Sequence, residues 1–330
     1  MSHVTVAADL DRIQNPPDMP GWSENLVAQT YDPTAGISVW AHWSRIPGSP
    51  HIWESIIAVY LQGDELLVSR SFGPSPARQS ASSGPLSFEC VEPNETWRLR
   101  FDGMALRSTA EALSRQSLAD GEVERLTVDV QFSGVHPTWS LHGELTGQVW
   151  ASAHLEQGCR TRGEVVTTAG TVPIDSFGFR DHSYGPRDYS GMIGDTWCSA
   201  VFPSGRALLA LKVWQFESAP LTVGFVWDGA TLHNASHVDV PPMHDRAGAP
   251  ASFFGTITTE LGVEQFEVVS DHRMTWTMHQ PVGMSAGTRS DGDLMHCVER
   301  PALVTWSGER TAGWFEKALR PSRFTAPGQN

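Results

Sequence analysis

The sequence has 330 residues, of which 40% are hydrophobic and 18% are charged, so it is long and apolar enough to form two domains with full cores. Its 37 acidic and 23 basic side chains give a formal charge of -14, which repels nucleic-acid phosphates and anionic lipid headgroups. The N-terminus lacks the basic start and apolar run of a signal peptide, and no stretch reaches the roughly 20 apolar residues of a membrane span. We therefore expect a cytoplasmic protein with no nucleic-acid partner and no stable membrane insertion.

The predicted elements begin with a proline-rich arm over residues 1–25, which we expect to be extended and to carry little chemistry. From residue 36 onward, alternating or β-branched runs predict strands at Ile37–Trp43, Ile56–Leu61, Trp97–Phe101, Leu126–Phe132, Val165–Thr168, Ala207–Trp214, Leu221–Trp227, Phe266–Val269 and Leu303–Trp306. Many runs are joined by glycine-containing turns, such as Gln62-Gly63-Asp64, Asp102-Gly103, Pro203-Ser204-Gly205, Asp228-Gly229 and Ser307-Gly308-Glu309. The best of the few helical patterns runs from Thr109 to Ala119. The pattern as a whole predicts an all-β fold of antiparallel barrels or sandwiches.

The change from one domain to the next is expected between Gly134 and Gly158, where the chain passes toward the segment richest in polar motifs. This gives an N-terminal β domain over residues 26–145 and a C-terminal β domain over residues 146–330. A short echo between Trp97–Gly103 and Val223–Gly229 is consistent with two related halves. The four cysteines, Cys90, Cys159, Cys198 and Cys297, have no close spacing and predict buried thiols in a reducing compartment.

The segment Arg180-Asp181-His182-Ser183-Tyr184-Gly185-Pro186-Arg187-Asp188 concentrates titratable side chains. On a strand, Arg180, His182 and Tyr184 would share one face and Asp181 and Ser183 the other. Polar groups fill an apolar core poorly, so the first face predicts a polar-lined pocket in which His182 is catalytic or contacts a ligand.

A structural interpretation of the same segment is an arginine–aspartate network that fixes the loop. Arg180 or Arg187 would pair with Asp181, Asp188 or the nearby Asp195.

The sequence lacks the motifs of metal binding, nucleotide binding and nucleophilic catalysis by serine. No histidine pair has the spacing of a common metal motif, so we expect no metal, and no nucleotide fingerprint or nucleophile elbow is present. The thirteen tryptophans make at least one aromatic-lined cavity an expectation.

The run His154-Leu155-Glu156-Gln157-Gly158, followed by the Arg180–Asp188 segment, resembles the lipocalin-like superfamily of carotenoid hydratases (hydroxyneurosporene synthase) and AttH-type proteins. It is most similar to a branch whose segment reads Arg-Asp-His-Ser-Trp-Gly-Pro-Arg. The resemblance implies two calycin-like β-barrels or sandwiches packed together, an apolar pocket, and chemistry without a cofactor on hydrophobic terpenoid or polyketide substrates.

In the hydratases of that superfamily, the motif histidine and the aromatic residue two positions later form the site with an acid. The resemblance places the first two roles on His182 and Tyr184, and leaves Asp181, Asp195 and Glu54 as alternative acids. We further expect Trp197 to form an aromatic cage with Tyr184. The other residues expected to contact substrate are Arg180, Glu54, Trp53 and Trp214, and those expected to form a structural network are Arg187 and Asp188.

Three functions remain open from the sequence. The first is a hydratase, dehydratase or isomerase that acts by acid–base chemistry on a hydrophobic unsaturated substrate. The second is a cyclase that mainly orients a flexible chain, like the superfamily's Diels–Alder members. The third is a non-catalytic carrier of a small hydrophobic molecule. The partner in each case is that small molecule, with a homodimer as a further possibility.

Overall fold

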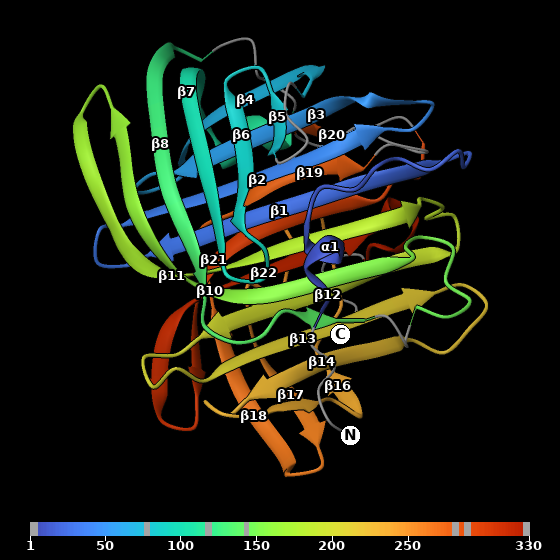
Figure 1. Ribbon diagram of the computed structural model, residues 1–330. Coiled ribbons are helices and arrows are strands. Elements are labelled where there is room, and N and C mark those ends of the chain that lie inside the picture. The colour runs from blue at the N-terminus through green and yellow to red at the C-terminus, as the bar shows by residue number, and fades with distance from the viewer. Residues whose placement is uncertain are drawn as a thin grey trace. The chain divides into compact units, whose positions relative to one another are not determined.

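The computed structural model describes residues 6–75, 80–115, 121–141, 145–278, 284–286 and 292–325. Nearly all of the regular structure is β, and the described strands pair in an antiparallel manner within two large sheets (Figure 1). The all-β prediction is confirmed. None of the described helices is long and apolar enough to cross a membrane.

The first sheet follows the strand order β4-β3-β2-β1-β11-β10-β8-β7-β6-β5. Since β4 also pairs with β7, this sheet closes on itself, and the short β9 pairs with β10 beside the main path. Its strands are β1 (Trp22–Asp32), β2 (Ile37–Ile46), β3 (Ser49–Tyr60), β4 (Glu65–Pro74), β5 (Ser80–Ser83), β6 (Leu86–Glu92), β7 (Thr96–Thr109), β8 (Val123–Gly134), β9 (Trp139–Ser140), β10 (Ala153–Thr167) and β11 (Gly170–Pro186). A short helix, α1 (Ala8–Asp11), precedes them.

The second sheet follows the order β15-β14-β13-β12-β22-β21-β18-β17-β16, with β19 paired to β20 and β21. Its strands are β12 (Met192–Val201), β13 (Ala207–Gln215), β14 (Leu221–Trp227), β15 (Leu232–Asn234), β16 (His237–Asp239), β17 (Ser252–Thr259), β18 (Gly262–Val269), β19 (Met274–Met278), β20 (Met284–Ala286), β21 (His296–Trp306) and β22 (Glu309–Leu319). In both sheets the last long strand pairs with the first, β11 with β1 and β22 with β12.

Two compact units correspond to the two sheets, and the boundary between their strands falls at Asp188/Tyr189. The boundary expected at residues 145/146 differs from this division, because β10 and β11 pair with β8 and β1 and so complete the first sheet. The Arg180–Asp188 segment therefore belongs to the first unit. The helical segment contributes α2 (Ala110–Ser114) to the second unit, and a 3-10 turn (Pro321–Arg323) follows β22.

Each unit has its own apolar core. Inward-facing side chains of the first sheet, including Trp43, Phe88, Trp97 and Phe132, form one cluster, and Cys198, Phe253 and Phe315 belong to the other. All four cysteines are buried and free, as the sequence predicts.

Two local predictions are wrong. Asp102-Gly103 lies inside β7 and forms no turn, because β7 continues to Thr109 in pairing with β8. The sequence similarity between Trp97–Gly103 and Val223–Gly229 does not correspond to a structural repeat. Asp102 and Gly103 lie inside β7, whereas Asp228 and Gly229 follow the end of β14. The turns at Gln62-Gly63-Asp64, Pro203-Ser204-Gly205 and Ser307-Gly308 do connect neighbouring strands.

Candidate functional site

The centre of the candidate site is β11, which lies between β1 and β10 (Figure 1). His182 is the Cα partner of Leu26 on β1 and of Leu155 on β10. A close approach of β1 makes this packing possible: a Cβ at Gly178 would meet the carbonyl oxygen of Gln29 at 2.2 Å. Because side chains alternate along the strand, the even and odd positions of the motif contact different partners.

Arg180 is buried at the centre of a network on the even-numbered face. Its Nη1 and Nη2 donate to the Asp11 carboxylate of α1 at 2.6 and 3.1 Å, and its Nε donates to Gln157 Oε1 at 2.9 Å. The guanidinium also lies 5.3 Å from the ring centroid of Trp97. Asp11 comes from the N-terminal arm, which was expected to carry little chemistry. The arm is not wholly extended, since it contains α1, and it supplies the buried counter-ion of the motif.

His182 forms a second buried pair on the same face. Its Nε2 lies 2.9 Å from Oε1 of Glu24, and the side chains of both residues are 0% exposed. The other Glu24 contacts are the backbone N–H of Gln14 at 2.7 Å and Nε of Arg45 at 2.8 Å. Since these two partners are N–H donors, the arrangement fits Glu24 as the acceptor of a hydrogen bond from Nε2–H of His182.

This hydrogen bond determines which nitrogen of His182 is left for chemistry. With Nε2 as the donor, the neutral imidazole presents a lone pair at Nδ1. That atom is buried and has no hydrogen-bond partner among the described residues. Aromatic rings surround the imidazole, with the Trp97 centroid at 6.0 Å and the Tyr184 centroid at 5.4 Å.

Tyr184 is half-buried beside this pair, and its backbone pairs with that of Glu24. Burial raises the pKa of the phenol to about 12, with further contributions from the Glu24 and Asp11 charges. The hydroxyl therefore stays protonated and can donate a hydrogen bond at neutral pH.

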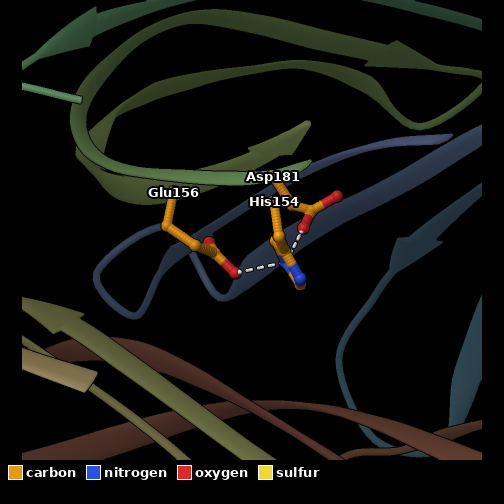
Figure 2. Close-up of side chains that lie close together, drawn as sticks. All are labelled: His154, Glu156 and Asp181. Atoms are coloured by element: carbon orange, nitrogen blue, oxygen red, sulfur yellow. Dashed lines mark hydrogen bonds and ion pairs between the residues drawn. The ribbon is translucent and has the colours of Figure 1, made fainter. Parts of the chain in front are cut away.

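The odd-numbered face holds a different cluster, shown in Figure 2. His154 Nε2 lies between Asp181 Oδ2, at short hydrogen-bonding distance, and Glu156 Oε1 at 3.1 Å. Burial alone would lower the pKa of His154, but Asp181 and Glu156 together raise it to about 10. Burial acts to raise the pKa of Asp181, yet His154 and Arg187 lower it overall. Asp181 is therefore an ionised partner of an imidazolium, which makes it a poor proton donor.

The same three residues could hold a metal ion. One ligand atom from each of His154, Glu156 and Asp181 lies within 4.8 Å of the others, and this nitrogen and oxygen set suits zinc, manganese or iron. A search for histidine pairs in the sequence misses it because the ligands come from two neighbouring strands. The imidazolium ion pair accounts for the arrangement without a metal.

Four more predicted residues lie in the first unit. Trp53 is buried under Arg45, whose Cζ is 4.4 Å from the indole centroid, so it borders the Glu24 network. Glu54 instead accepts from Nε of Arg70 at 2.6 Å, which marks it as an ion-paired carboxylate.

Arg187 is buried and donates to the Trp150 carbonyl at 2.9 Å and to Ser183 Oγ at 3.0 Å. The Asp188 side chain is exposed, and its N–H donates to the Val149 carbonyl. Arg187 thus restrains the end of the segment through Trp150 and Ser183.

The remaining predicted residues, Asp195, Trp197 and Trp214, lie in the second unit on β12 and β13. Trp197 is the Cα partner of Glu316, and Trp214 lies 5.5 Å below the ammonium of Lys212. These residues belong to a different compact unit from His182, and an aromatic cage of Trp197 and Tyr184 stays a prediction.

A family model described as a domain of unknown function, DUF7064, matches residues 8–320. The chain belongs to the DUF7064 family. A comparison with curated proteins finds no match.

Solved structures resemble the DUF7064 chain in fold. A Nitrosomonas europaea protein, NE1406, whose structure carries a provisional AttH assignment, is 12% identical with a TM-score of 0.61, over 90% of this chain and 91% of that one. The crystal structure of CghA is 9% identical with a TM-score of 0.55, over 91% and 88%. The structure of CghA with Sch210972 gives 9% and 0.56, over 91% and 89%. The two-domain calycin-like fold is thereby established, whereas the narrower Arg-Asp-His-Ser-Trp-Gly-Pro-Arg branch stays a prediction.

The sequence reasoning missed several buried polar groups of the DUF7064 chain. Asp11 and Glu24 are isolated in the sequence, and only the fold brings them to Arg180 and His182. Glu299, in the second unit, accepts hydrogen bonds from the indole N–H groups of Trp276 and Trp314 at 3.2 and 2.8 Å. Burial, and then the neighbouring Glu316, raises the pKa of Glu299 well above its usual range. No local motif predicts such a neutral carboxyl.

Proposed function

We propose that the protein is a cofactor-independent dehydratase or isomerase that acts by acid–base chemistry on a hydrophobic unsaturated small molecule. The observation that carries this proposal is the His182–Glu24 pair, with the second imidazole nitrogen buried and without a hydrogen-bond partner among the described residues. A histidine held by a carboxylate in this way is a suitable general base, because the carboxylate fixes the tautomer and stabilises the imidazolium that forms.

The charges around His182 favour removal of a substrate proton over protonation of an alkene. Asp11 accepts bonds from Arg180, Glu24 accepts from Arg45, and Asp181 is paired with His154. Direct protonation of an alkene requires a neutral carboxylic acid, which these ion-paired groups do not supply. Removal of a substrate proton by Nδ1 of His182 needs only the base that is present, where an adjacent carbonyl group or a departing allylic hydroxyl receives the electrons of the C–H bond.

The residues around His182 can carry out the remaining steps of the reaction. Tyr184 can donate its phenolic proton to a departing hydroxyl, which leaves as water, or hydrogen-bond to a developing oxyanion. In an isomerisation, His182 returns the proton to a different carbon of the substrate. The Trp97 and Tyr184 rings would contact the apolar part of the molecule and, in a dehydration, stabilise the positive charge that develops as the hydroxyl departs.

A carrier of a hydrophobic molecule is the second candidate. Arg180 is completely engaged by Asp11, Gln157 and Thr138, which favours a structural role for at least part of the motif. CghA, a protein with a similar fold, has been crystallised with Sch210972. A cyclase that mainly orients its substrate would also use such a fold and would need no titratable residue.

Incubation with polyene probes separates these functions. We would use all-trans-retinol and cis-parinaric acid, and follow binding by fluorescence and products by liquid chromatography with mass spectrometry. The proposal expects a product of unchanged mass with a shifted double bond, or one that has lost a water. It expects His182→Gln to abolish that product and the exposed His51→Gln to leave it unchanged. Tight binding with the probe recovered unchanged would instead support the carrier.

A further inference from the structure

Lys317 is unusual in the composition of this chain. The sequence contains 23 basic Lys and Arg residues, but only Lys212 and Lys317 are lysines. Lys317 lies on β22 between β12 and β21, where its Cα partners are Thr196 and Val298. Its relative exposure is 0%. One of the two lysines therefore lies inside the second unit.

The surroundings of the Lys317 amine are largely apolar. Its Nζ lies 4.6 Å from the ring centroid of Phe253 and 5.7 Å from that of Phe315, both of which belong to the core of the second unit. Its hydrogen bond to protein is a donation to the Pro250 carbonyl at 3.0 Å. No carboxylate within the described part of the chain forms an ion pair with Lys317, although long buried side chains with a charge are normally paired.

The nearby charges do not replace that missing partner. Burial, and then the Arg300 guanidinium, together lower the pKa of Lys317 to about 7, against smaller opposing effects of Cys198 and Asp245. Arg300 itself donates to the carbonyls of His272 and Ala247. A substantial fraction of the Lys317 side chain is thus a neutral amine at neutral pH, which is the nucleophilic form.

Lys212 is the internal control for this comparison. Its ammonium donates to the Asp239 carboxylate at 2.8 Å and lies over Trp214. Lys212 therefore has the carboxylate partner that Lys317 lacks among the described residues.

We propose that Lys317 is a covalent attachment site for an apolar aldehyde, which it binds as an imine inside the second unit. The Nζ lone pair attacks the carbonyl carbon to give a carbinolamine. Loss of the carbonyl oxygen as water, with two protons from the amine, then leaves a C=N bond, so no oxidant or reductant is needed. The two phenylalanine rings select an apolar chain, and they stabilise a protonated imine by cation–π attraction.

Reductive trapping tests this proposal directly. The intact protein is incubated at neutral pH with decanal and sodium cyanoborohydride, which reduces an imine to a stable secondary amine, and the adduct is located by peptide mass spectrometry. We expect alkylation of Lys317 at a rate at least roughly tenfold above that of Lys212, because burial leaves more of the Lys317 amine neutral than the ordinary pKa of a lysine allows. The adduct should persist in Lys212→Arg and vanish in Lys317→Met.

The Lys317→Met variant should fold, because methionine fills a similar volume and removes a buried cation. A second readout needs no variant: all-trans-retinal should form an imine with the wild-type protein, and its absorption should shift to longer wavelength on protonation. Labelling confined to Lys212 or the N-terminal amine, or no adduct on folded wild-type protein, would overturn the proposal. Neither outcome bears on the His182 chemistry of the first unit.

Discussion

Replacement of Asp11 by asparagine should strongly destabilise the first unit. The Asp11 carboxylate accepts two bonds from Arg180, one from the backbone N–H of Asn94 at 2.6 Å and one from Nε1 of Trp97 at 3.0 Å. An asparagine retains one acceptor oxygen and turns an amide N–H group toward these donors. The buried guanidinium of Arg180 then loses its counter-ion.

The expected magnitude follows from that loss. Removal of one partner of a buried ion pair costs about 3–5 kcal/mol, because the other charge is left uncompensated in the interior. We would measure the free energy of unfolding in urea, with amide hydrogen exchange to report on β11 separately. The matched control is Asp9→Asn, because Asp9 is exposed on the same helix and should change stability by less than about 0.5 kcal/mol.

The pH dependence provides an independent check. Burial tends to raise the pKa of Asp11, but the charge and hydrogen bonds of Arg180 and the N–H of Asn94 lower it overall. The unfolded chain therefore takes up this proton at a higher pH than the folded protein does. The stabilisation is present above about pH 4 and is lost as the pH falls further, so it should be missing in Asp11→Asn. A loss of less than about 1 kcal/mol at neutral pH would refute the structural role assigned to Asp11.

Three further predictions concern other parts of the fold. Asp181→Asn should lower the pKa of His154 from about 10 toward its ordinary value, as measured by histidine NMR titration; a pKa that stays near 10 would contradict the ion pair. Because the pKa of Glu299 is raised, its contribution to stability is lost as the pH rises, so Glu299→Gln should gain stability relative to wild type between about pH 5 and 8 in urea unfolding. An unchanged difference across that range would exclude a neutral Glu299. Gly178→Ala should cost about 1–3 kcal/mol, whereas Gly191→Ala, with open space at its Cβ, should cost less; equal thermal shifts would contradict the close packing of β1 on β11.

The sequence was informative where local chemistry determines structure. Strand patterns and glycine turns predicted an all-β chain, and alternation along β11 predicted that Arg180 and His182 would share a face. The motif itself was recognisable because its residues are consecutive. The division of the chain was less predictable, since β10 and β11 join the first sheet through pairing with β8 and β1, which no linker composition reveals.

The partners of the motif could not be predicted because they are distant in the sequence. Glu24 lies 158 positions before His182, and Asp11 lies 169 positions before Arg180. Each is an ordinary acidic residue until the fold buries it beside a cation. Lys317 could not be recognised from the sequence for the same reason. Its unusual environment depends on Phe253 of β17 and on Pro250 of the preceding loop, which are distant in the sequence.

The central claim of the proposed function is that His182 acts as a general base, and the rate of conversion in a His182 variant tests it most directly. On whichever polyene probe the wild-type protein converts, we would compare the single-turnover rates of wild type, His182→Gln and the exposed control His51→Gln. Loss of a general base predicts a fall of roughly 100-fold or more for His182→Gln, and no change for His51→Gln. A His182→Gln variant that binds the probe and converts it within about tenfold of the wild-type rate would contradict acid–base catalysis at this site.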